Sequence, residues 1–132
     1  MRIFLAMTAL ACLTSTASLA QEANCANPTS QVEMTYCAGV AHDEADVELN
    51  AAYKKAIAQA KAQDAHISSD QIPSRSLLRD AQRSWIKFRD EACSAESTLF
   101  RGGTAQSMLF LECMTRLTKR RTEDLLLFAE TN

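Results

Sequence analysis

The chain has 132 residues, of which 47% are hydrophobic and 23% are charged, so it has the size and composition of one compact domain. Only 3 Gly and 2 Pro occur, which argues against a β-sandwich or a low-complexity linker because both rely on these residues for turns. With 14 Lys and Arg against 16 Asp and Glu, the chain lacks the basic excess that binds nucleic acid. The composition therefore predicts a single all-α domain.

The first twenty residues have the pattern of an export signal. Arg2 forms a short basic start, residues 3–13 form an apolar run, and Ser18 and Ala20 place small residues at the cleavage positions. The apolar run is much shorter than the roughly 20 residues that a membrane-spanning helix needs. We therefore expect a signal peptide at 1–20, no integral membrane span, and a periplasmic or secreted location.

Cleavage after Ala20 would leave a mature domain at 21–132. A competing cut would produce a lipoprotein anchored through Cys12, but it would discard the better cleavage site at Ala20. Cleavage at Ala20 removes Cys12 and leaves four cysteines: Cys25, Cys37, Cys93 and Cys113. An even number of cysteines in an exported domain predicts two disulfides, and the absence of a C-x₂-C pair disfavours zinc.

The first helix is expected at about residues 30–62. Thr29 or Ser30 can cap its amino terminus, and Glu33 lies in the first turn. Apolar residues then recur at helical spacing along one drifting face: Val32, Tyr36, Val40, Val47, Leu49, Tyr53, Ile57 and Ala60.

A polar, turn-forming segment from Ala62 to Ser76 predicts a loop, followed by a second helix at about 75–98. The apolar stripe of this helix comprises Leu77, Leu78, Ala81, Trp85, Phe88 and Ala92.

Gly102-Gly103 can adopt positive φ and predicts a tight turn, after which Thr104 can cap a third helix at about 104–129. Its inner side is expected to carry Met108, Leu111, Met114, Leu117, Leu125, Leu126 and Phe128. Three helices packed antiparallel form a bundle.

The turn also ranks the disulfide pairings. Cys93 lies nine residues before Gly102 and Cys113 ten residues after Gly103, so folding at the turn brings the two cysteines level. This favours Cys93–Cys113 together with Cys25–Cys37. The pairing Cys37–Cys93 with Cys25–Cys113 stays open, because the start of the first helix should lie near the end of the second.

No arrangement of residues points to catalysis. His42 and Asp46, four residues apart, could share a metal ion on one helix face, but the sequence offers no third convergent ligand. His66 lies in the polar loop, and neither a Ser/His/Asp pattern nor a Gly-rich phosphate loop occurs. We expect no enzyme activity, no metal and no cofactor.

Two polar stripes are more specific. Asp46, Asn50 and Tyr53 share one face of the first helix, and Gln82, Trp85 and Arg89 repeat the spacing on the second. We expect Arg89 to meet Asp46, and Gln82 to meet Asn50 or Tyr53, in a buried structural network; the alternative is a groove that binds a ligand. The basic cluster Lys119-Arg120-Arg121 is expected to be a solvated helix face, with an anion or peptidoglycan contact as the alternative.

Taken together, these motifs resemble a known family. The four cysteines, Asp46-x-x-Leu49-Asn50-x-x-Tyr53, Ala81-Gln82-x-x-Trp85, Arg89, Gly102-Gly103 and Leu117-Thr118-x-x-Arg121 are similar to the lysozyme inhibitor LprI-like N-terminal domain family. The resemblance implies a small, helical, disulfide-linked domain of exported bacterial proteins and, for the family's namesake, inhibition of lysozyme. It carries over no inhibitory residue, so the matching positions are framework or candidate binding residues.

Two hypotheses follow from the resemblance. The first is a protein that binds and inhibits a lysozyme-type muramidase, whose usual basic character suits a mildly acidic partner. The alternative is a structural or interaction module of the cell envelope that binds another envelope protein.

Overall fold

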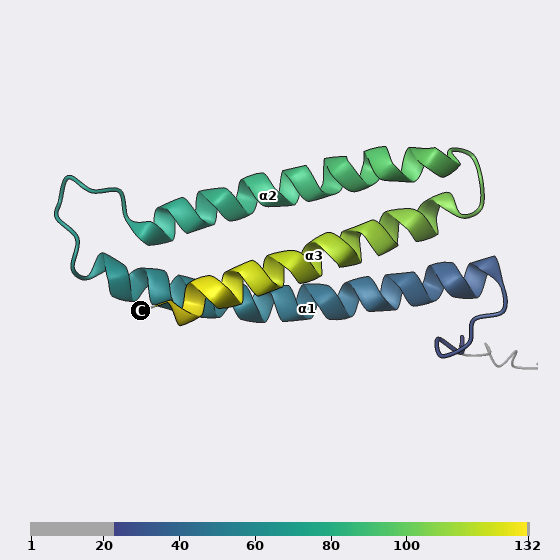
Figure 1. The fold of residues 1–132 in the computed structure, drawn as a ribbon, viewed down its shortest axis with the longest axis horizontal. Helices are drawn as coiled ribbons and strands as arrows, with labels where there is room; N and C mark the ends of the chain where they lie inside the picture. Colours follow the sequence, from purple (N-terminus) through teal and green to yellow (C-terminus); the bar gives the residue numbers. More distant parts are fainter. Residues whose placement is uncertain (1–22, 132) are drawn as a thin grey trace, which may run out of the picture.

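The structure, a computed structural model, describes residues 23–131 and consists of three long helices (Figure 1). Helix α1 spans Gln31–Asp64, α2 spans Ser74–Ser97, and α3 spans Gln106–Glu130, with a short 3₁₀ helix, η1, at Thr98–Phe100. The all-α prediction is confirmed. Helix α2 runs antiparallel to α1 and α3, which run in the same direction.

The predicted signal peptide and Cys12 lie outside the described residues. No helix within 23–131 combines the length and apolar character that crossing a membrane requires.

A capping box fixes the start of α1. The Ser30 hydroxyl accepts a hydrogen bond from the Glu33 amide at 3.2 Å, and the Glu33 carboxylate accepts from the Thr29 and Ser30 amides at 2.7 and 3.1 Å. The bond from the Thr29 amide, followed by that from the Thr29 hydroxyl, lowers the pKa of Glu33 below its ordinary value of 4.5. The Cys25–Cys37 disulfide ties the preceding segment to this end of the helix. The predicted cap at Ser30 is confirmed.

The start of α2 is capped from another helix. Pro73 precedes the first turn and offers no side-chain cap. Instead, the carboxylate of Asp64, the last residue of α1, accepts hydrogen bonds from the Ser74 and Arg75 amides. These amides have no acceptor within α2, because the first amides of a helix lie beyond its own hydrogen-bond pattern. The Asp64 carboxylate supplies the acceptors and thereby joins the two ends of the connecting loop.

The turn between α2 and α3 confirms the predicted disulfide pairing. Gly102 has φ of +78°, the left-handed conformation that favours glycine. The turn brings Cys93 and Cys113 to a Cα–Cα distance of 5.4 Å, and they form the second disulfide. The alternative pairings are thereby excluded. Thr104 is not the helix cap as predicted, because α3 begins two residues later, where the Gln106 side chain accepts from the Gly102 amide.

Small residues form the seam between α1 and α3. The buried face of α1 consists of Ala45, Leu49, Ala52, Ala56 and Ala60, and α1 packs more extensively against α3 than against α2. The apolar face predicted for α1 is therefore partly wrong: Val32, Tyr36 and Val47 are 80%, 58% and 70% exposed. Small alanine side chains, which a pattern of large apolar residues does not capture, occupy the inward positions.

The inner face of α2 is also rotated relative to the prediction. Leu78 is buried and Trp85 packs partly against the core, but Leu77 and Phe88 are exposed. Gln82 and Arg89 occupy buried positions instead. On α3, Met114 and Leu125 are buried, and Phe110 and Leu117 pack beside the Cys93–Cys113 disulfide. The core is thus apolar between α1 and α3 and partly polar where α2 joins it.

The core predicts a sharp contrast between two neighbouring leucines. Leu125 is almost completely buried, whereas Leu127 is 68% exposed. Leu125→Ala should lower the free energy of unfolding by about 3 kcal/mol, because it removes packed methyl groups and leaves a cavity. Leu127→Ala should change it by less than about 0.5 kcal/mol. Guanidinium denaturation with intact disulfides measures both, and equal losses would contradict this assignment of the core.

The capping box predicts a pH dependence at the start of α1. Folding lowers the pKa of Glu33, so the contribution of its ionised form to stability is fully present above pH 4.5 and is lost as the pH falls through the lowered value. Amide exchange protection in the first turn of α1 should fall over that range. In Glu33→Ala the acid-dependent part should vanish, and an unchanged pH profile in that variant would assign the effect to another group.

Candidate functional site

The predicted polar residues gather midway along the molecule, where α1 faces α2. Asp46, Asn50 and Tyr53 from α1 and Gln82 and Arg89 from α2 line a hollow of about 360 Å³. We call this hollow the α1–α2 groove; its remaining lining residues are Leu49, Arg79, Arg83 and Ile86.

Arg89 lies at the buried inner side of this groove. Its Nη1 lies 3.9 Å from Asp46 Oδ1, which matches the predicted pairing, and donates to the Thr118 hydroxyl of α3 at 3.4 Å. Its Nε donates to Asp90 at 2.9 Å, and its guanidinium lies 5.1 Å from the centre of the Trp85 ring. Arg89 thus links all three helices through one charged group.

Gln82 lines the same groove as Asn50 and Tyr53 but forms no side-chain hydrogen bond with either, contrary to the prediction. Its side-chain oxygen accepts a hydrogen bond from Arg121 Nε of α3 at 2.9 Å. The partner comes from α3 because α2 packs more extensively against α3 than against α1. Asn50 is exposed and donates to the backbone and side-chain oxygens of Asp46 at 2.8 and 2.9 Å.

The predicted buried network therefore divides in two. Gln82, Arg89, Thr118 and Arg121 form a polar layer between α2 and α3, while Asp46 and Asn50 lie at the solvent-facing rim of the groove. The basic cluster on α3 divides in the same way: Lys119 and Arg120 are exposed, and Arg121 is half-buried against Gln82.

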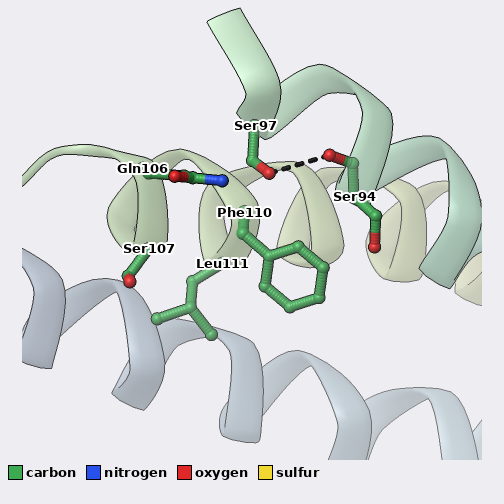
Figure 2. Close-up of a pocket in the computed structure, with 6 residues that line it drawn as sticks. All are labelled: Ser94, Ser97, Gln106, Ser107, Phe110 and Leu111. Carbon is green, nitrogen blue, oxygen red and sulfur yellow. Dashed lines mark hydrogen bonds between the residues drawn. The ribbon is translucent and has the colours of Figure 1, made fainter. Parts of the chain in front are cut away.

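Two further hollows lie at the end of the molecule that carries the α2–α3 turn. One, of about 670 Å³, is lined by α1 and by residues at the start of α3; we call it the amino-terminal hollow, and it comprises Gln31, Val32, Thr35, Tyr36, Gly39, Asp43, Thr104 and Ser107. The other, of about 500 Å³, lies between α2 and α3 and shares Ser107; Figure 2 shows Leu111 at its lower edge, directed toward α1. Its lining residues are Ser94, Ser97, Gln106, Ser107, Phe110 and Leu111.

Sequence reasoning missed both of these hollows. The signal available for the larger one was a glycine at position 39, inside a long helix, preceded by the apolar residues Val32 and Tyr36 that the pattern placed inside.

The side chains that line the α1–α2 groove can offer a ligand ion pairs and hydrogen bonds. The α1–α2 groove holds three guanidinium groups and one carboxylate, with no nucleophile beside a base among its lining residues.

The two histidines lie elsewhere. His42 Nδ1 lies 3.8 Å from Asp43 and its Nε2 is buried without a hydrogen-bond partner, while His66 is exposed in the loop. Over the described part of the chain, no three His, Cys, Asp or Glu residues converge to hold a metal ion, so the predicted pair His42 and Asp46 lacks a third ligand there.

The polar layer predicts a measurable coupling between α2 and α3. In a double-mutant cycle, Gln82→Leu and Arg121→Met should show a coupling of about 1–2 kcal/mol, because their hydrogen bond is partly buried and Gln82 is only 8% exposed. Glu96 and Arg116 join the same two helices at 2.6 Å but are 44% and 43% exposed, so their cycle should give less than about 1 kcal/mol. Equal couplings would mean that burial adds nothing to the Gln82–Arg121 bond.

Comparisons with known proteins give a family match, a related sequence and a similar solved structure. The family model described as lysozyme inhibitor LprI matches residues 22–125. An uncharacterised protein from Rhizobium meliloti (strain 1021) is 34% identical over 124 residues, covering 91% of this chain and 89% of the relative. The crystal structure of a DUF1311-family protein from Pseudomonas putida KT2440 superposes with a TM-score of 0.66 at 25% identity, covering 79% of this chain and 97% of that one.

The family match covers both disulfides, the α1–α2 groove and the polar layer. The chain therefore belongs to the lysozyme inhibitor LprI family.

Proposed function

We propose that this protein is an exported inhibitor that binds a lysozyme-type muramidase and blocks it without performing catalysis itself. The observation that carries the proposal is the match of residues 22–125 to the lysozyme inhibitor LprI family. That match spans α1, α2 and most of α3, so the proposal concerns the whole helical domain.

The charge distribution supports a basic partner. Residues 31–53 carry Glu33, Asp43, Glu44, Asp46 and Glu48 and contain no Lys or Arg. Lysozymes are usually basic, and a surface of opposite charge accelerates their encounter and disfavours other orientations. An acidic helix of this kind therefore suits an inhibitor better than a protein that binds the anionic polymers of the cell envelope.

The location of the protein is consistent with this partner. Two disulfides are typical of proteins in an oxidising compartment outside the cytoplasm. The predicted signal peptide at residues 1–20 would deliver the mature domain, residues 21–132, to the periplasm or beyond. A muramidase that attacks the bacterial cell wall would be met there.

Titration against purified lysozymes tests the proposal. The protein, purified from the periplasm of an expression host with its disulfides oxidised, is titrated into chicken-, goose- and invertebrate-type lysozymes acting on bacterial cell walls. We expect stoichiometric inhibition of at least one of them, weakening as salt concentration rises because salt screens opposite charges. Chemically reduced protein serves as the control and should inhibit less.

If the folded protein inhibits none of the three enzymes, the proposal is wrong. The alternative, a cell-envelope interaction module with another protein partner, would then account for the same framework. Partner capture from a periplasmic extract would be the next measurement for that alternative.

A further inference from the structure

A stripe of exposed side chains runs along the amino-terminal half of α1. Val32, Tyr36, Asp43 and Val47 are all exposed, and with Gly39 they follow one another at intervals of three or four residues. This spacing places them on one face of the helix. The buried alanines that face α3 belong to the other side of α1.

We propose that this stripe, together with the amino-terminal hollow beside it, is the surface that contacts the muramidase. The inference rests on the proposed function and deepens it, because it assigns the contact to one face of one helix. The partner it commits to is a basic enzyme with an apolar group able to enter the hollow.

The first argument is the apolar content of the surface. Val32 and Tyr36 are 80% and 58% exposed, and both line the same hollow, so their apolar side chains lie together rather than scattered over the surface. They border a hollow of about 670 Å³, large enough to accept a side chain of a partner. Tyrosine is enriched at the centres of protein interfaces, where it combines a rigid apolar ring with a polar end.

The second argument is Gly39, which lines the hollow. A glycine in the interior of a helix makes that helix less stable than an alanine would. Where one occurs, it often allows another element to approach the helix closely. A Cβ atom at position 39 would lie 3.9 Å from Leu111 Cδ1, an ordinary contact, so packing against α3 does not require glycine. What the missing side chain does achieve is to leave the hollow open.

The third argument is charge, which decides between this surface and the α1–α2 groove. Asp43 is exposed on the stripe, Glu44 and Glu48 are exposed on other sides of the same part of α1, and the first basic residue along the helix is Lys54. The groove instead exposes Arg79 and Arg83 on α2, and both lie beside the Asp80 carboxylate, at 3.6 and 3.8 Å. A basic enzyme is therefore attracted to the first surface, whereas the paired charges of the second offer it no comparable attraction.

The surface is also held rigid before any partner binds. The Cys25–Cys37 disulfide and the capping box at Ser30 both fix the end of α1 that carries Val32 and Tyr36. A preordered surface loses less conformational entropy on binding, so more of the contact energy appears as affinity.

Two sets of substitutions test the proposal through the inhibition constant against a lysozyme that the unaltered protein inhibits. Asp43→Lys with Glu44→Lys reverses exposed charges, and Gly39→Leu fills the hollow. Each should raise the inhibition constant at least about tenfold, the loss typical of a central interface position. Circular dichroism and a thiol assay confirm that each variant is folded and oxidised.

The matched control is Glu123→Lys with Asp124→Lys, which reverses two exposed neighbouring charges on α3. It changes the net charge by the same amount and should raise the inhibition constant less than about twofold, because long-range attraction alone is largely screened at physiological salt. An equal loss in this control would mean that net charge, rather than this surface, controls binding.

The outcomes separate the two proposals. Absence of inhibition by the unaltered protein would overturn both the function and the surface. Inhibition that survives both α1 changes but is lost in Arg79→Glu with Arg83→Glu would leave the function standing and move the contact to the α1–α2 groove. Losses confined to the α1 variants would support the surface proposed here.

Discussion

The close packing of α1 against α3 through alanine side chains is the constraint on which the rest of the architecture depends. Ala45, Ala52, Ala56 and Ala60 are almost completely buried, and small side chains allow two helices to pack closely. The inward side of α2 instead presents the long side chains of Gln82 and Arg89. Helix α2 therefore cannot close on α1 as tightly as α3 does, and Figure 1 shows it set apart along most of its length. The α1–α2 groove is a direct consequence of this difference in side-chain size.

Because the apolar seam does not include most of α2, other interactions must hold that helix in place. The Cys93–Cys113 disulfide fixes one end to α3, and the Asp64 carboxylate fixes the other end to α1. Between these ends, Arg121 and Thr118 supply hydrogen-bond partners to the buried Gln82 and Arg89. Buried polar groups are costly without partners, so the polar layer sets the register of α2 more strictly than apolar contacts alone would.

Local signals in the sequence predicted the helices, the turn and the disulfides, because each is determined by residues close together in the chain. Ser30 with Glu33 marks a helix start, Gly102 marks a turn, and the distances from that turn bring Cys93 and Cys113 level. The rotation of each helix was harder to predict, since it depends on which side of the helix the others cover. The pattern placed Val32 and Phe88 inside, where the structure has alanines on α1 and polar residues on α2. The partner of Gln82 likewise depended on the relative packing of three helices, which no single-helix pattern contains.

The exposure of apolar residues on α1 that the sequence pattern placed inside supports the contact surface proposed above. A helix with one buried face gains nothing in folding from large apolar residues on another, and exposed apolar side chains increase the risk of aggregation. Departures from the sequence rules for a stable fold tend to occur at functional sites.

On α1 the exposed Val32, Tyr36 and Val47 are accompanied by carboxylates, which keep the surface soluble while the protein is free. A contact surface binds more tightly when it is already ordered in the free protein, because less conformational entropy is lost on binding. The Cys25–Cys37 disulfide and the capping box stabilise the end of α1 at which Val32 and Tyr36 lie, so the interactions that hold this end of the helix also order the proposed contact surface.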